Sequence, residues 1–124
     1  MYSLPIIILV ASMGVSAPSP IKLTEKDSGH TVEIAAGSVM EVLLKGNPTT
    51  GYTWVVASVD ESILTQIGEA EFKAERKARG SGGTITLRFR AEGVGKTFLK
   101  LMYHRPFEKD RPPLKTFEVK VEVQ

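Results

Sequence analysis

The stretch Thr84-Ile85-Thr86-Leu87-Arg88-Phe89-Arg90-Ala91 decides the fold of this chain. Apolar and polar residues alternate along it without exception, with the apolar set on one face and the threonines and arginines on the other. Successive side chains of a β-strand point to opposite faces of a sheet, so this period of two is typical of a strand with one buried and one solvated face. The stretch therefore predicts a sheet that covers a core on one side only.

The same alternation recurs on both sides of this stretch. It predicts strands over 31–35, 39–45, 52–57, 97–103 and 116–123, with turn residues between them. Residues 71–78 are a further strand candidate, although their charged composition would suit a helix equally well. Residues 58–70 stay open: Asp60-Glu61-Ser62 could cap a short helical turn, or Ile63, Thr65 and Ile67 could form a brief strand. The pattern predicts an all-β, immunoglobulin-like antiparallel β-sandwich of about seven to eight strands.

Three of the connections between these strands have unusual compositions. They are Asn47-Pro48-Thr49-Thr50-Gly51-Tyr52, Gly80-Ser81-Gly82-Gly83 and Arg105-Pro106-Phe107. If each strand runs antiparallel to the one before it, alternate connections fall at the same end of the sandwich. We therefore expect these three connections to lie together, as the antigen-binding loops of antibody variable domains do.

In this order and spacing, the three motifs resemble those of the chagasin-type inhibitors of cysteine peptidases, and the resemblance extends over residues 21–124. It implies an immunoglobulin-like domain that inhibits papain-like (clan CA) peptidases, such as cathepsin L-like enzymes, reversibly and competitively. It also implies that the first motif enters the active-site cleft and the other two clasp it. The implied peptidase-binding residues are Asn47, Pro48, Thr49, Thr50, Gly51, Tyr52, Gly80, Ser81, Gly82, Gly83, Arg105, Pro106 and Phe107. The family more often has Trp at the last position, so Phe107 departs from its pattern.

These residue types suit such a task on physical grounds. Pro48 and Gly51 favour a compact turn that is costly to stretch into the extended form of a substrate. The glycines of residues 80–83 allow one backbone to approach another closely, and Phe107 is the kind of aromatic anchor that dominates interface energetics. Each motif alone also fits a structural role: a hairpin turn for 80–83, a surface ion pair for Arg105, and a core position for Phe107.

Composition narrows the other possibilities. The net charge of +2 is small and the two signs are interleaved, which argues against a nucleic-acid partner. The chain has no cysteine, and its two histidines, His30 and His104, lie in separate segments. We therefore expect no metal site, no cofactor and no enzymatic activity. The alternative to an inhibitor is an immunoglobulin-like adhesion or carbohydrate-binding module.

Residues 1–17 differ from the rest of the chain. They contain no charged side chain, an apolar run from Leu4 to Val10, and small residues at Val15-Ser16-Ala17. The run is too short to span a bilayer, and the small residues suit a signal peptidase. We expect a cleaved secretory signal followed by a monomeric inhibitor domain over 18–124, without stable membrane association. The expected location is a secreted, vesicular or lysosome-like compartment, or the periplasm of a bacterium. A buried N-terminal strand is the alternative.

The predicted signal makes a simple test possible. Because cleavage after Ala17 would remove an uncharged apolar segment, protein isolated from its native source should begin near Pro18. Intact-mass measurement checks this, and recovery of a chain that starts at Met1 would contradict it.

Overall fold

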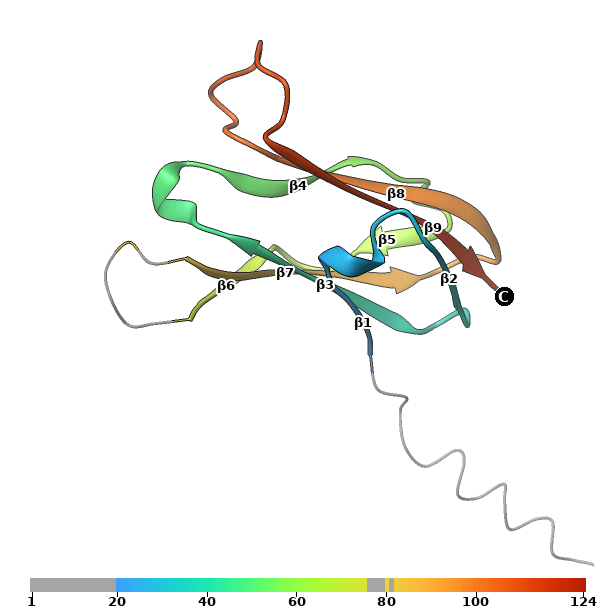
Figure 1. The fold of residues 1–124 in the computed structure, drawn as a ribbon. Helices are drawn as coiled ribbons and strands as arrows, with labels where there is room; N and C mark the ends of the chain where they lie inside the picture. Colours follow the sequence, from blue (N-terminus) through green and yellow to red (C-terminus); the bar gives the residue numbers. More distant parts are fainter. Residues whose placement is uncertain (1–19, 76–79, 81) are drawn as a thin grey trace, which may run out of the picture.

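The computed structural model describes residues 20–75, 80 and 82–124. Within these residues the chain forms two β-sheets packed face to face (Figure 1). The strands are β1 (Ile21–Leu23), β2 (Thr31–Ile34), β3 (Val39–Gly46), β4 (Thr53–Ser58), β5 (Leu64–Gln66), β6 (Glu71–Ala74), β7 (Gly83–Ala91), β8 (Gly95–His104) and β9 (Lys115–Val123). One sheet has the order β1-β3-β7-β5, with β6 also paired to β7, and the other has the order β2-β9-β8-β4. The predicted β-sandwich is confirmed.

The core lies between the sheets and is built from the inward faces that the alternation predicts. In β7, Ile85, Leu87, Phe89 and Ala91 are all buried, while Thr86 and Arg88 between them are only partly buried. The matching inward residues of the other long strands are Met40, Val42, Leu44, Leu99, Leu101, Tyr103, Phe117, Val119, Val121 and Val123. A strand with one apolar face buries it by packing against the apolar face of a second sheet, which accounts for the two-layer architecture.

Most neighbouring strands are antiparallel, as predicted, but one edge pair in each sheet is parallel. β1 runs parallel to β3, and β2 runs parallel to β9. Hairpins force neighbouring strands to be antiparallel, but neither of these pairs is joined by a hairpin. β1 is separated from β3 by β2, which lies in the opposite sheet. β1 itself was not predicted, because its three residues are too few to show an alternation.

Residues 58–70 contain both of the structures that the sequence left open. The Asp60 carboxylate accepts hydrogen bonds from the Ser62 hydroxyl and amide, which lower the pKa of the Asp60 carboxyl, and a turn follows. The chain then forms β5, whose fully buried residue is Leu64 rather than its neighbours Ile63 and Thr65. The strand predicted over 71–78 is observed as β6, and residues 76–78 lie outside the described residues.

The three unusual connections lie at one end of the sandwich, as predicted. Gly46 at the end of β3 pairs with Gly83 at the start of β7, and Thr53 at the start of β4 pairs with His104 at the end of β8. We call residues 47–52 the first loop, 80–82 the second loop and 105–114 the third loop. Together they form the loop end of the molecule (Figure 1).

Three other connections, residues 35–38, 59–63 and 92–94, meet at the opposite end. There the Gly37 amide donates to the Ala91 carbonyl at 2.7 Å, and the Glu92 amide donates to the Ile63 carbonyl at 2.8 Å. No helix in the described ranges is long and apolar enough to cross a membrane. The predicted signal segment, residues 1–17, lies outside the described residues.

Candidate functional site

The first loop is a closed turn that Asn47 holds in shape. Pro48–Thr50 form one turn of 3-10 helix with Asn47 as its N-cap. The Asn47 Oδ1 accepts hydrogen bonds from the Thr49 amide at 3.2 Å and from the Thr49 hydroxyl at 2.6 Å. Gly51 ends the turn at φ 87°, a left-handed conformation that favours glycine, and its amide donates to the Pro48 carbonyl. The loop is therefore compact rather than extended.

Tyr103 in β8 ties the first loop to the core. Its hydroxyl accepts a hydrogen bond from the Asn47 amide at 2.9 Å, although the residue is only 5% exposed. The Tyr103 ring lies 5.2 Å from the ring of Tyr52 and 5.1 Å from that of Trp54, between centroids. The Trp54 indole donates to the Lys45 carbonyl, just before the loop, at 3.0 Å. Both ends of the first loop are thus anchored to the aromatic part of the core.

The second loop lies beside the first and is bonded to it. The Asn47 side-chain amide donates to the Gly80 carbonyl at 3.0 Å, and Gly80 has a φ of 78°. Gly83, at the start of β7, packs so closely on β6 that an added Cβ would overlap the Lys73 carbonyl oxygen. A Cβ added to Gly82 would lie 3.4 Å from the Gly46 carbonyl oxygen, an ordinary van der Waals contact. Ser81 lies outside the described residues.

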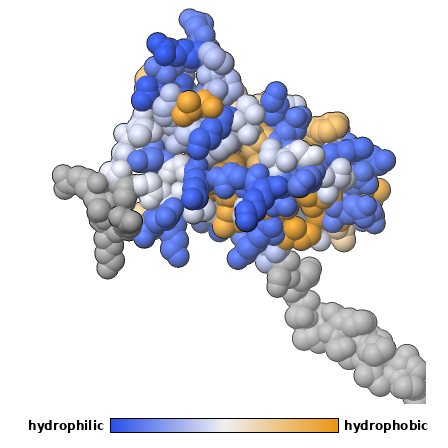
Figure 2. Space-filling view, in the orientation of Figure 1, coloured by the Kyte–Doolittle hydropathy of each residue, from blue (hydrophilic) through white to orange (hydrophobic). Residues whose placement is uncertain are grey.

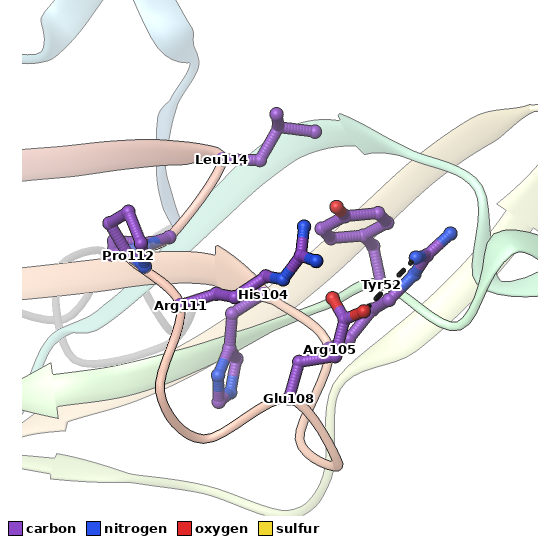
Figure 3. Close-up of a pocket in the computed structure, with 8 residues that line it drawn as sticks. Tyr52, His104, Arg105, Glu108, Arg111, Pro112 and Leu114 are labelled. Carbon is purple, nitrogen blue, oxygen red and sulfur yellow. Dashed lines mark ion pairs between the residues drawn. The ribbon is translucent and has the colours of Figure 1, made fainter.

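Arg105 joins the third loop to the first. Its Nε donates to the Thr50 carbonyl at 2.9 Å, and its guanidinium carbon lies 4.5 Å from the centre of the Tyr52 ring. A terminal nitrogen of the same guanidinium is 3.6 Å from the Glu108 carboxylate (Figure 3). The side chain therefore makes the ion pair that a structural role predicts, and it also clamps two of the three loops together.

Phe107 stands on the loop end with its ring free on one side. It is 72% exposed, so the alternative that places it in the core is wrong. The ring lies against the first loop, since a Cβ added to Gly51 would be 3.3 Å from it. Pro106 beside it is also exposed. The structure thus brings twelve of the thirteen predicted residues, all except the undescribed Ser81, to one end of the sandwich.

Two parts of this arrangement were missed by the sequence analysis. Tyr103 fits the inward pattern of β8, and only its hydroxyl, which needs a hydrogen-bond partner when buried, signalled a second role. Glu108, the ion-pairing partner of Arg105, carries no signal in a loop rich in charge. Within the described ranges, no group of His, Asp and Glu residues could hold a metal ion. The arrangement presents a surface for contact.

Comparison with known proteins identifies the family. The model of the Chagasin family peptidase inhibitor I42 matches residues 33–121, most of the chain. The chain belongs to the chagasin family. Amoebiasin-1 of Entamoeba histolytica is 36% identical over 107 residues, which cover 84% of this chain and 100% of that protein. Chagasin of Trypanosoma cruzi is 32% identical over 91 residues, which cover 69% of this chain and 82% of that protein.

A solved structure agrees with this membership. The crystal structure of the cysteine protease inhibitor EhICP2 from Entamoeba histolytica superposes with a TM-score of 0.75 at 27% identity. The match covers 87% of this chain and 100% of that one. Chagasin-family members are peptidase inhibitors, so the expectation that this chain is not an enzyme is confirmed by its family. Membership also favours an inhibitor over the alternative of an adhesion or carbohydrate-binding module.

The clamp formed by Arg105 can be tested by amide hydrogen exchange. In Arg105→Ala, the Thr50 and Gly51 amides should exchange roughly five times faster, because a hydrogen bond worth about 1 kcal/mol no longer supports the first loop. Arg105→Lys keeps a cation near Tyr52 but lacks the forked donor, so it should restore protection only in part. The β7 amides serve as the control and should not change. Unaltered exchange at Thr50 and Gly51 in both variants would contradict the clamp.

Proposed function

We propose that the chain is a reversible, competitive inhibitor of papain-like cysteine peptidases. In this proposal the first loop enters the active-site cleft, and the second and third loops contact the cleft on either side. The observation that carries it is the bonded loop end: Asn47 bonds the second loop at Gly80, and Arg105 bonds the first loop at Thr50. A surface held together in this way loses little conformational entropy on docking, which favours tight binding.

The hydrogen bonds inside the first loop support occlusion rather than cleavage. Its carbonyl oxygens at Asn47, Pro48 and Thr50 all accept hydrogen bonds from within the molecule. A peptidase needs an extended segment whose carbonyl can enter its oxyanion hole. Several of these bonds would have to break before the first loop could be stretched into such a segment. The loop should therefore occupy the cleft without being cut.

The threonine hydroxyls define what the cleft must offer. The Thr49 hydroxyl donates to the Asn47 side chain, and the Thr50 hydroxyl donates to the Asn47 carbonyl, each at 2.6 Å. Each hydroxyl has one proton, so both donors are already used within the loop. Their oxygen lone pairs remain, and both residues are exposed. We expect the peptidase to meet these oxygens with hydrogen-bond donors.

The secretory route remains a proposal that rests on sequence. An inhibitor on this route would meet either a peptidase of the same secretory route or a peptidase of another organism. We further propose that the inhibitor acts as a monomer, since one copy presents all three loops.

Titration against papain tests the proposed function. The purified protein should abolish papain activity, with an apparent inhibition constant that rises with substrate concentration and activity that returns on dilution. Because the loop is closed by its own hydrogen bonds, the inhibitor should be recovered at full mass after long incubation. Binding should still be detectable when the catalytic cysteine carries a small alkyl group. Stoichiometric cleavage between Pro48 and Tyr52 would instead indicate a substrate-like mechanism.

Removing the exposed aromatic ring tests the contribution of the third loop. Phe107→Ala should weaken papain binding by about 1–3 kcal/mol, or roughly 5- to 150-fold, mostly through faster dissociation. The thermal midpoint should stay within a degree or so, because the ring is 72% exposed. Val94→Ala is the control, since Val94 is 74% exposed at the opposite end. If Phe107→Ala dissociates from papain at the wild-type rate, Phe107 does not contribute to peptidase binding.

A further inference from the structure

A cavity of about 280 Å³ lies under the third loop, beside the surface proposed to face the peptidase. Its lining residues are Tyr52, His104, Arg105, Glu108, Arg111, Pro112, Pro113 and Leu114 (Figure 3). Tyr52 is the last residue of the first loop, so the cavity borders that loop directly. The third loop projects beyond the sandwich and its outer part is covered by hydrophilic residues (Figures 1 and 2).

The charges around the cavity do not balance. It is lined by two guanidinium groups, from Arg105 and Arg111, but by the carboxylate of Glu108 alone. Glu108 pairs with Arg105, whose Nε is also bonded to Thr50. Within the described part of the chain, Arg111 takes part in no ion pair. Its guanidinium points toward Tyr52 in Figure 3, while the His104 ring points away. The cavity therefore carries one uncompensated cation.

Backbone hydrogen bonds shape the part of the third loop that carries Arg111. The Arg111 amide donates to the Glu108 carbonyl at 3.4 Å, and the Leu114 amide donates to the Tyr103 carbonyl at 2.8 Å. Pro112 and Pro113 between these two points fix their own φ angles. A guanidinium presents parallel N–H donors that match the two oxygens of a carboxylate. Arg111 is exposed, so a carboxylate can reach it from solvent.

We propose that this cavity binds an acidic side chain of the target peptidase, and that Arg111 takes its carboxylate. The proposal rests on the proposed function and adds a polar contact outside the three motifs. Arg105 is the positioning residue that keeps Glu108 away from Arg111, and Arg111 is the residue that selects the partner. Peptidases with an acidic residue beside the cleft are the ones that this inhibitor should bind most tightly.

Two variants of the third loop separate a specific contact from a general charge effect. Arg111→Ala and Lys109→Ala each remove one positive charge from the same exposed segment, but Lys109 does not line the cavity. Arg111→Ala should dissociate roughly ten times faster from a papain-like peptidase that has an acidic residue beside its cleft, because a charge-assisted hydrogen bond is lost. Lys109→Ala should stay within about twofold, as expected for a solvated charge. Equal effects of the two variants would overturn the proposal.

A titration without peptidase tests the cavity by itself. N-acetyl-triglutamate amide added to the full protein should shift the NMR signals of the Arg111 Nε–H and of Leu114, and the matching triglutamine peptide should not. Arg111→Ala should abolish the Leu114 shift and Lys109→Ala should preserve it. No shift at millimolar peptide, or an unchanged shift in Arg111→Ala, would overturn the proposal. Failure to inhibit papain would instead refute the proposed function, whatever the peptide does.

Discussion

The hydrogen bond from the Asn47 amide to the Tyr103 hydroxyl joins the hydrophobic core to the loop end. Tyr103 is nearly buried, so its hydroxyl requires a partner, and the first residue of the first loop supplies one. The side chain of Asn47 then bonds both its own turn and Gly80 of the second loop. The pair of Asn47 and Tyr103 thus determines the positions of the first and second loops relative to the core. Loss of either partner would leave a polar group without its bond at that boundary.

The loop end divides its side chains between two tasks. Asn47 and Arg105 each donate hydrogen bonds within the molecule, and these bonds hold the loops in position. Phe107 and the lone pairs of the two threonines face outward and remain available. Because the first group has already ordered the surface, a partner that meets the second group has little left to immobilise. The shape of the outward surface therefore depends on the residues that hold the loops in position.

Much of this arrangement could be predicted from sequence, for reasons that particular residues make clear. The alternation of apolar and polar residues from Thr84 to Ala91 predicted which face of β7 is buried, and the structure confirms it. The gathering of the three motifs followed from strand direction alone. The parallel pairing of β1 with β3 could not be predicted, because no hairpin joins them. Nor could the bond from Arg105 to Thr50, since it depends on where two loops cross in space.

Strand register also places Ile21 and Val123 at the same end of the sandwich. Ile21 pairs with Met40 near the start of β3, and Val123 pairs with Gly95 at the start of β8. Both β3 and β8 run toward the loop end, so both extremities leave the sandwich at the opposite pole (Figure 1). A linker, a fluorescent label or a solid support attached at either extremity would leave the loops facing open solution. A tether at either position would therefore lie on the far side of the sandwich from the three loops.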